Sequence, residues 1–322
     1  MTVMDAFSAM ADRLQQTAVS SSKEAAILGR TLARMLQDES IDESVWAAFA
    51  NDAGMIEAVI VALEMCTDDD PGDLLCCVTM LLSLCPVQSR ATLLTRPALR
   101  SCILRNLPLN DANSCNTERC LALLRMLCGN GSPVRIPLDD DLSIVGRCLD
   151  LIPLQTDTMA IESVAPVVML HAGMPGDIVI QAICNHKDSG DFSHALLRYW
   201  NRAPTPELDR SCLQFVCDVL RTGHAAMFYV NDVAVVVDIV LRQLTDATFN
   251  STLLYLLLDC LWYVLHSEPY LERNHKLTET TELLHKMRSE AQTEGDSRAA
   301  HLIGAIGDRI AAVVRESTAA AP

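Results

Sequence analysis

Apolar residues recur along most of this chain with the spacing of amphipathic α-helices. The segment 233–244 is a clear case, because its apolar residues follow the i, i+3, i+4, i+7 rule. No segment alternates apolar and polar residues with the period of two that marks a half-buried strand. The pattern predicts an all-α protein with helices over 4–18, 22–37, 41–50, 54–66, 72–85, 97–106, 116–128, 140–153, 158–171, 175–184, 192–201, 206–222, 232–246, 251–267, 278–291 and 297–315.

The predicted helices are of moderate length and are separated by short segments rich in Gly, Pro and Asp, such as GNGSPVRIP at 129–137 and RAPTP at 202–206. This organisation fits either a globular helical bundle or an armadillo/HEAT-type superhelix with repeats of roughly 40 to 47 residues. We favour the α-solenoid, because 322 residues without a composition break are long for one compact core, whereas stacked repeats extend a core. We therefore predict one armadillo-like helical domain over 1–315 and a disordered tail at 316–322.

The helix at 251–267 is apolar on nearly all sides, which is typical of a middle helix covered by neighbours. Its apolar stretch, 253–265, contains Asp259 and is too short to cross a bilayer, so we expect no membrane insertion. The first residues, MTVMDAFSAMADRL, lack the features of a signal peptide. The chain has 13 cysteines, most of them within apolar helical runs, which indicates buried thiols in a reducing compartment, cytosol or nucleus.

The formal net charge of −16 argues against nucleic acid as a partner, because a phosphate backbone meets a repulsive average field. Two interpretations of the acidic balance stay open. The chain either binds proteins that carry basic patches or is acidic only for solubility.

Motifs for catalysis or for a cofactor are absent from the sequence. The eight histidines form no H-E-x-x-H, the glycines form neither G-x-G-x-x-G nor a P-loop, and no C-x-x-C supports zinc. The acidic triplets 68–70 and 139–141 are contiguous, unlike EF-hand ligands, and are expected to cap helices. We expect no enzymatic activity, no metal and no cofactor. An enzyme with scattered catalytic residues stays an alternative, and it predicts a deep polar pocket with clustered titratable groups.

The C-terminal third carries an ordered series of features. GHAAMFYVNDVAVVVDIVLRQLTD at 223–246 is followed by the leucine-rich LLYLLLDCLWYVLHSEPYLERNHKLTETTELLHKM at 253–287. Over roughly 209–290 the chain resembles the leucine-rich armadillo domain of the WISH/DIP/SPIN family, which comprises the Nck-interacting SH3 proteins and shorter fungal relatives. No SH3 domain or proline-rich segment precedes this region, so the chain resembles the fungal members and SH3-dependent partners are not carried over.

The resemblance implies binding to the Arp2/3 complex through the armadillo domain and activation without a pre-existing filament. The product is a linear, unbranched actin filament that seeds branched networks, for example at cytoplasmic endocytic patches. Actin itself is an indirect partner, no cofactor is implied, and the chain is a possible homodimer. The alternative is a helical-repeat adaptor that scaffolds another cytosolic protein.

Within this region some residues are expected to have structural roles. Asn231 or Asp232 is predicted as the N-cap of the helix that follows, and the aromatic pair Phe228 and Tyr229 is expected to pack against it, as in a hydrophobic staple. The candidates for contact with a partner are polar or aromatic residues nearby: Asp238, Arg242, Tyr270, Arg273, His275 and Lys276.

Two of these candidates, Asp238 and Arg242, have the i, i+4 spacing of an ion pair on one helix face, which stabilises a helix by about 0.2 to 0.5 kcal/mol. For them a solvated face and a partner-binding face stay equally open. Arg273, His275 and Lys276 form a basic exposed cluster on an acidic protein and are the favoured contacts.

Overall fold

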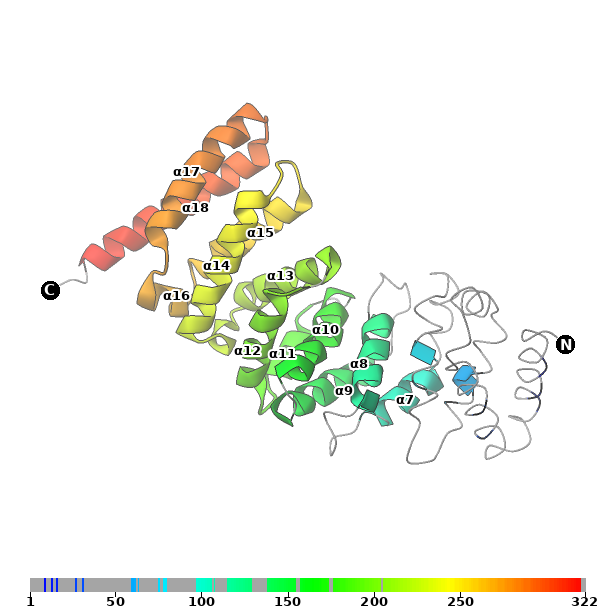
Figure 1. The fold of residues 1–322 in the computed structure, drawn as a ribbon. Coiled ribbons are helices and arrows are strands. Elements are labelled where there is room, and N and C mark those ends of the chain that lie inside the picture. Colours follow the sequence, from blue (N-terminus) through cyan, green and yellow to red (C-terminus); the bar gives the residue numbers. More distant parts are fainter. Residues whose placement is uncertain are drawn as a thin grey trace. The chain divides into compact units, whose positions relative to one another are not determined.

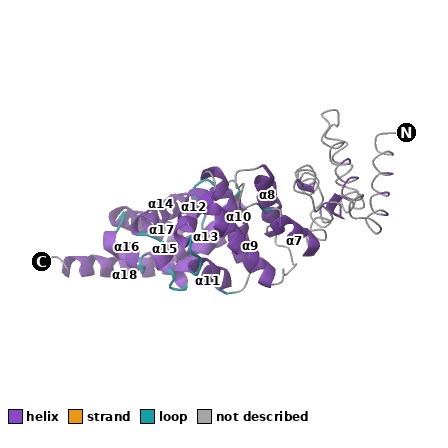
Figure 2. Ribbon diagram, turned by 90° about the horizontal axis from the view of Figure 1, so that it is seen from below, coloured by secondary structure: helices purple, strands orange, loops and turns teal. Residues whose placement is uncertain are grey.

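The computed structural model describes residues 97–105, 107, 115–128, 138–154, 157–173, 176–203 and 205–319, together with isolated positions before residue 97. Every regular element within these stretches is helical, which confirms the all-α prediction (Figures 1 and 2). The helices predicted between 4 and 85 lie outside the continuously described residues. By contact density the chain divides into two compact units, 1–159 and 160–322.

In the first unit the described elements are three helices and a short 3-10 turn: α7 (Pro97–Arg105), α8 (Cys115–Cys128), α9 (Leu138–Leu151) and η1 (Ile152–Leu154). Their apolar faces are buried, for example at Leu123 in α8 and Ile144 in α9. The second acidic triplet, 139–141, lies inside the first turn of α9 and not before it, because the helix already begins at Leu138.

α10 (Asp157–Gly173) begins at the end of the first unit and continues into the second. The remaining elements are α11 (Ile178–Cys184), α12 (Ser189–Trp200), α13 (Pro206–Arg221), η2 (Ala225–Met227), α14 (Val230–Asp246), α15 (Thr252–Val264), α16 (Glu268–Arg273), α17 (Leu277–Thr293) and α18 (Ser297–Ala319).

The helices from α12 to α18 form two parallel rows (Figure 1). In the first row α12 packs on α14 and α14 on α17, and in the second row α13 packs on α15 and α15 on α18. The first-row helices begin at residues 189, 230 and 277, which are 41 and 47 residues apart. This spacing is that of HEAT and armadillo repeats, which span roughly 40 to 47 residues. The fold is thus a helical-repeat solenoid, as the sequence predicted.

The core of the second unit runs between the two rows. α14 buries the face that carries Val233, Val237 and Val240, as the apolar periodicity required. α15 is buried on several sides, including Leu257 and Leu261, because α13, α14 and α18 all pack against it. This confirms the prediction of a covered middle helix.

Most observed boundaries lie within a few residues of the predicted ones, because local capping groups set them. Thr205 accepts a hydrogen bond from the Leu208 backbone N–H at the start of α13, and Ser251 accepts one from Leu254 at the start of α15. The structure differs from the prediction in two places. The connection after α15 contains α16, which the sequence pattern did not predict, and α18 continues beyond 315 to Ala319.

The described cysteines are free thiols, and most of them are buried. Burial raises the pKa of Cys148 and of Cys217 to about 12, so that both thiols stay protonated. They therefore behave as the small apolar core residues that the sequence indicated. Among the described helices, none combines the length and the apolar character needed to cross a membrane.

Candidate protein-binding surface

The helix α14 exposes one stripe of side chains, Asn231, Val235, Asp238 and Arg242, on the side opposite its buried valines. These positions are spaced by three or four residues, so they share one helix face. α12 flanks α14 on one side, and α16 and α17 also contact it. We call this stripe, together with Tyr229, Arg273, His275 and Lys276, the α14 surface.

The N-terminus of α14 is capped differently from the prediction. The N-cap residue is Tyr229 and the helix begins at Val230, so neither Asn231 nor Asp232 is the N-cap. Asp232 occupies the third helical position, where its carboxylate accepts a hydrogen bond from the Tyr229 backbone N–H at 3.0 Å. This is the acidic half of a capping box, so Asp232 still satisfies a helix-end donor, from inside the helix.

The buried carboxylate of Asp232 also connects α14 to α12. The Ser193 hydroxyl donates to it at 3.3 Å, and His194 Nε2 lies 3.4 Å from its other oxygen. Both contacts come from the first-row neighbour α12. A residue predicted only to cap a helix therefore also fixes the stacking of two repeats.

The two aromatic residues before α14 have different environments. Phe228 is buried, as is Val233, and the two occupy the positions of a hydrophobic staple, which confirms the packing prediction for Phe228. Tyr229 is 60% exposed, which contradicts that prediction. Its ring stacks on His194 with a centroid distance of 5.8 Å, because the extended backbone of the cap directs the side chain toward α12.

Asp238 is paired with the segment that connects α16 to α17. His275 Nε2 lies 2.9 Å and Lys276 Nζ 3.2 Å from the same Asp238 oxygen. Partial burial acts to raise the pKa of Asp238, but hydrogen bonds with His275 and Lys276 outweigh it, so the pKa is lowered. The predicted ion pair between Asp238 and Arg242 is therefore wrong, since the folded chain supplies Asp238 with two cations that are distant in sequence.

Arg242 and Arg273 have neutral partners. Arg242 Nη1 donates to the side-chain carbonyl of Asn201, just after α12, at 3.0 Å. Arg273 Nη1 donates from α16 to the side-chain carbonyl of Asn231 at 2.8 Å. Both arginines are exposed, and each is held in place by a hydrogen bond to an asparagine. Because asparagine is uncharged, it does not neutralise the positive charge of the arginine.

Tyr270 lies inside the protein, with 2% of its surface exposed, which removes it from the candidate surface. Burial raises the pKa of its hydroxyl to about 12. This hydroxyl has no hydrogen-bond partner within the described part of the chain. α16 packs against α14, and the buried ring contributes to this short helix as an apolar anchor.

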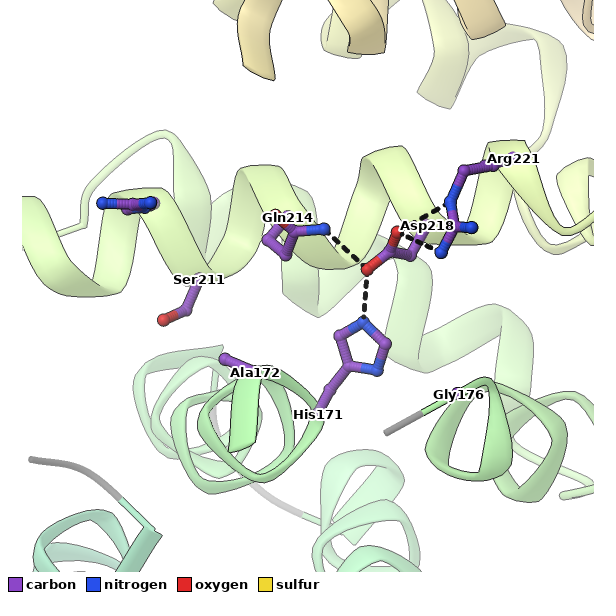
Figure 3. Close-up of a pocket in the computed structure, with 8 residues that line it drawn as sticks. His171, Ala172, Gly176, Ser211, Gln214, Asp218 and Arg221 are labelled. Atoms are coloured by element: carbon purple, nitrogen blue, oxygen red, sulfur yellow. Dashed lines mark hydrogen bonds and ion pairs between the residues drawn. The ribbon is translucent and has the colours of Figure 1, made fainter. Parts of the chain in front are cut away.

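A separate pocket of about 360 Å³ lies beside α10 and α13, and it is the feature that sequence reasoning missed (Figure 3). Asp218 is among the residues that line it, and its carboxylate accepts hydrogen bonds from His171 at 3.0 Å, from Gln214 at 2.7 Å and from Arg221 at 3.1 and 2.8 Å. Burial acts to raise the pKa of Asp218, but these bonds, led by that from His171, lower it to about 2. Gln214 lies four residues before Asp218 and Arg221 three residues after it, so the sequence places both on the same face of the helix as Asp218. The sequence does not indicate the contact with His171, because His171 lies on another helix.

The pocket has the clustered titratable groups that an enzyme would need, but its contacts are those of a structural connection between helices. His171 is buried, and its Nε2 is engaged by Asp218. The Ser211 hydroxyl, the nucleophile candidate in the lining, donates to the Glu207 backbone carbonyl instead of contacting His171. Within the lining residues no nucleophile therefore contacts a base, the arrangement that acyl transfer requires.

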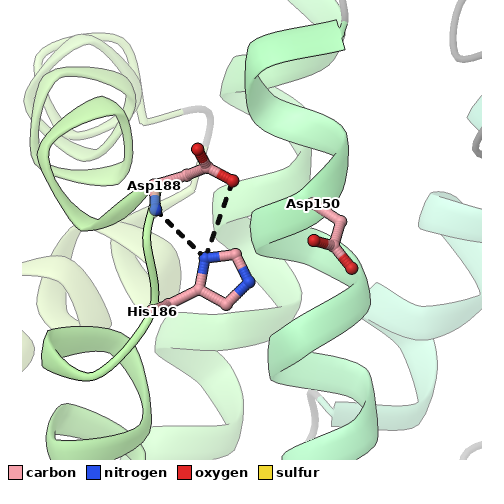
Figure 4. Close-up of side chains that lie close together, drawn as sticks. All are labelled: Asp150, His186 and Asp188. Carbon is pink, nitrogen blue, oxygen red and sulfur yellow. Dashed lines mark hydrogen bonds and ion pairs between the residues drawn. The ribbon is translucent and has the colours of Figure 1, made fainter.

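A further histidine–aspartate contact lies in the connection between α11 and α12 (Figure 4). The Asp188 backbone N–H donates to His186 Nδ1 at 3.2 Å, and the Asp188 carboxylate lies 3.7 Å from the same nitrogen. Nδ1 is therefore used in a local turn, and this ring nitrogen is not free to ligate a metal.

Residues of this region match a known protein family. The family model described as SPIN90/Ldb17, leucine-rich domain, matches residues 154–280. The matched segment runs from the end of η1 to the first turn of α17, and it includes the whole of α14. It begins further toward the N-terminus than the resemblance noted from the sequence, which was specific over roughly 209–290. Residues 154–280 are thus similar to the SPIN90/Ldb17 leucine-rich domain, which confirms the resemblance to the WISH/DIP/SPIN family.

Proposed function

We propose that this protein binds the Arp2/3 complex and activates it without a preformed filament, so that the complex nucleates a linear, unbranched actin filament. Such filaments then seed branched networks. The observation that carries the proposal is the match of residues 154–280 to the SPIN90/Ldb17 leucine-rich domain. Kinship with this domain supports a role related to actin and the Arp2/3 complex, and the nucleation mechanism is our extension of it.

The geometry of the α14 surface suits an activator that acts by binding. An activator shifts a conformational equilibrium only by its difference in affinity for the two states. A surface held by hydrogen bonds from α14 to neighbouring segments, such as Asp238 to His275 and Arg242 to Asn201, presents its groups in one arrangement. Such a surface favours the one conformation of a partner that matches it.

In this proposal the protein is not an enzyme and needs no cofactor, because it activates the Arp2/3 complex by protein–protein contact alone. Its place is the cytoplasm, at cortical or endocytic actin patches. Neither nucleic acid nor membrane insertion has a role in it, and actin is reached through the complex.

The test is fluorescence-monitored actin assembly with purified Arp2/3 complex and this protein, without other activators or preformed filaments. We expect a shorter lag than with the complex alone or the protein alone, and unbranched filaments when single filaments are imaged. An unchanged lag, together with no binding of the folded protein to the complex, would refute the proposal. That result would leave a helical-repeat adaptor for another partner.

A further inference from the structure

We infer that the α14 surface binds an acidic segment of a protein partner, and that Arg242 and Arg273 receive the carboxylates of that segment. The inference deepens the proposed function and rests on it, because the Arp2/3 complex is the partner that we propose.

The cations of the α14 surface fall into two groups by their partners. His275 and Lys276 both contact the Asp238 carboxylate, and Lys276 also contacts Glu279 at 3.3 Å. Arg242 and Arg273 bond only to amide oxygens, and no carboxylate among the described residues lies within ion-pair distance of either. Unlike His275 and Lys276, the two arginines therefore keep an uncompensated positive charge on the α14 surface, which the carboxylates of an acidic partner can pair with.

The asparagine partners hold the two guanidinium groups in place and occupy only part of their hydrogen-bonding capacity. Each arginine donates through Nη1 to an asparagine on a neighbouring element, Asn201 or Asn231, and keeps its other N–H donors available. A guanidinium binds a carboxylate through two parallel hydrogen bonds, which requires a defined orientation. Because the side chains are already held, less conformational freedom is lost when an acidic partner binds.

The positions of the two arginines on the α14 surface set the spacing that we expect between the carboxylates of the partner's acidic segment. Arg273 reaches the α14 surface at Asn231, and Arg242 lies eleven residues further along α14, which corresponds to about 16 Å along the helix axis. Arg273 comes from α16, whereas Arg242 leans toward the end of α12, so the two charges lie diagonally across α14. The matching segment therefore carries carboxylates separated by roughly this distance.

Exposed apolar groups accompany the two charges. Val235 is 40% exposed and lies along α14 between Asn231 and Arg242, and the exposed Tyr229 precedes Asn231. Tyrosine and arginine are among the residues that contribute most to binding at protein interfaces. The α14 surface therefore fits an acidic segment that also carries apolar side chains.

The test replaces both arginines by glutamine, R242Q/R273Q, in the full chain and compares binding to purified Arp2/3 complex. Arg210→Gln is the control for the loss of an exposed positive charge elsewhere, because Arg210 is exposed, lies on the second-row helix α13 and loses one charge, as does each of the two replaced sites. Close charge pairs across a protein interface are worth about tenfold in affinity or more, so we expect a loss on the order of a hundredfold for the double variant. Arg210→Gln should bind within about twofold of the wild type, and thermal unfolding should be unchanged for both.

A second measurement separates this inference from the proposed function. Fluorescence anisotropy with a labelled polyglutamate peptide at low salt reports on the acidic-segment site whether or not the Arp2/3 complex is the partner. We expect the wild type and Arg210→Gln to bind the peptide and R242Q/R273Q to lose binding. If the wild type binds the peptide but not the complex, the proposed function fails and the acidic-segment site stands.

Two results would overturn the inference. One is a wild-type protein that does not bind polyglutamate, and the other is a double variant that binds both the complex and the peptide as the wild type does. Equal loss of peptide binding in Arg210→Gln also counts against it, because the attraction would then be general and not located at the α14 surface.

Discussion

Replacing Asp218 with asparagine is expected to destabilise the protein by about 2 to 3 kcal/mol at neutral pH. The folded structure lowers the pKa of this carboxyl from 3.8 to about 2, and each pKa unit corresponds to about 1.4 kcal/mol of preference for the charged form. The side chain is only 13% exposed, so solvent screens its contacts weakly.

The geometry around Asp218 explains why asparagine cannot replace it. One carboxylate oxygen accepts from Arg221, and the other accepts from His171 and Gln214. Asparagine has one carbonyl oxygen and one amide NH₂, so on one side a donor would face other donors. Buried His171 would also lose the carboxylate that it contacts, which adds a desolvation cost.

The pH dependence has a definite sign. Because the pKa of Asp218 is lower in the folded chain than in the unfolded one, its contribution is fully present above about pH 4. The contribution is lost as the pH falls from 3.8 toward 2, since both states then bind the proton. The difference between the wild type and Asp218→Asn should therefore be constant between pH 5 and about 7 and should shrink below pH 4.

The assay is urea unfolding of the full chain, followed by far-UV circular dichroism, with the free energy obtained by linear extrapolation. The control is Glu282→Gln, which removes an exposed carboxylate of α17 with the same change of charge and should alter stability by less than about 0.5 kcal/mol. The reasoning would be refuted if Asp218→Asn matched this control, or if its deficit were as large at pH 3 as at pH 7.

Three further changes test other parts of the structure. Tyr270→Phe removes a buried hydroxyl without a described partner, so the free energy of unfolding in urea should stay the same or rise by up to about 1 kcal/mol, and a loss above that amount would indicate an unseen hydrogen bond. Ser251→Ala removes the acceptor for the Leu254 N–H at the start of α15 and should cost about 1 kcal/mol in the same assay, whereas Ser251→Gly should cost only a few tenths. Cys148 and Cys217 should resist iodoacetamide in the folded protein and react fully in urea, because burial raises the pKa of both thiols to about 12; labelling of either at the rate of an exposed thiol, read by mass spectrometry, would contradict its buried position.

The sequence by itself determined the features that depend on neighbouring residues. The 3.6-residue period of the apolar positions fixed α14 and its buried face, and Thr205 with Pro206 marked the start of α13. Apolar character on nearly all sides identified α15 as a covered helix. The order of features after Phe228 was enough to indicate the family whose leucine-rich domain matches residues 154–280.

Only the tertiary structure decided which polar groups meet. Asp238 has Arg242 four residues away, yet it pairs with His275 and Lys276, because the connection between α16 and α17 lies against α14. His171 and Asp218 are 47 residues apart and meet only because α10 and α13 pack together. Tyr270 is buried and Tyr229 is exposed, although both are tyrosines next to helix ends. Local spacing determines which face of a helix a residue lies on, whereas the stacking of repeats determines what that face contacts.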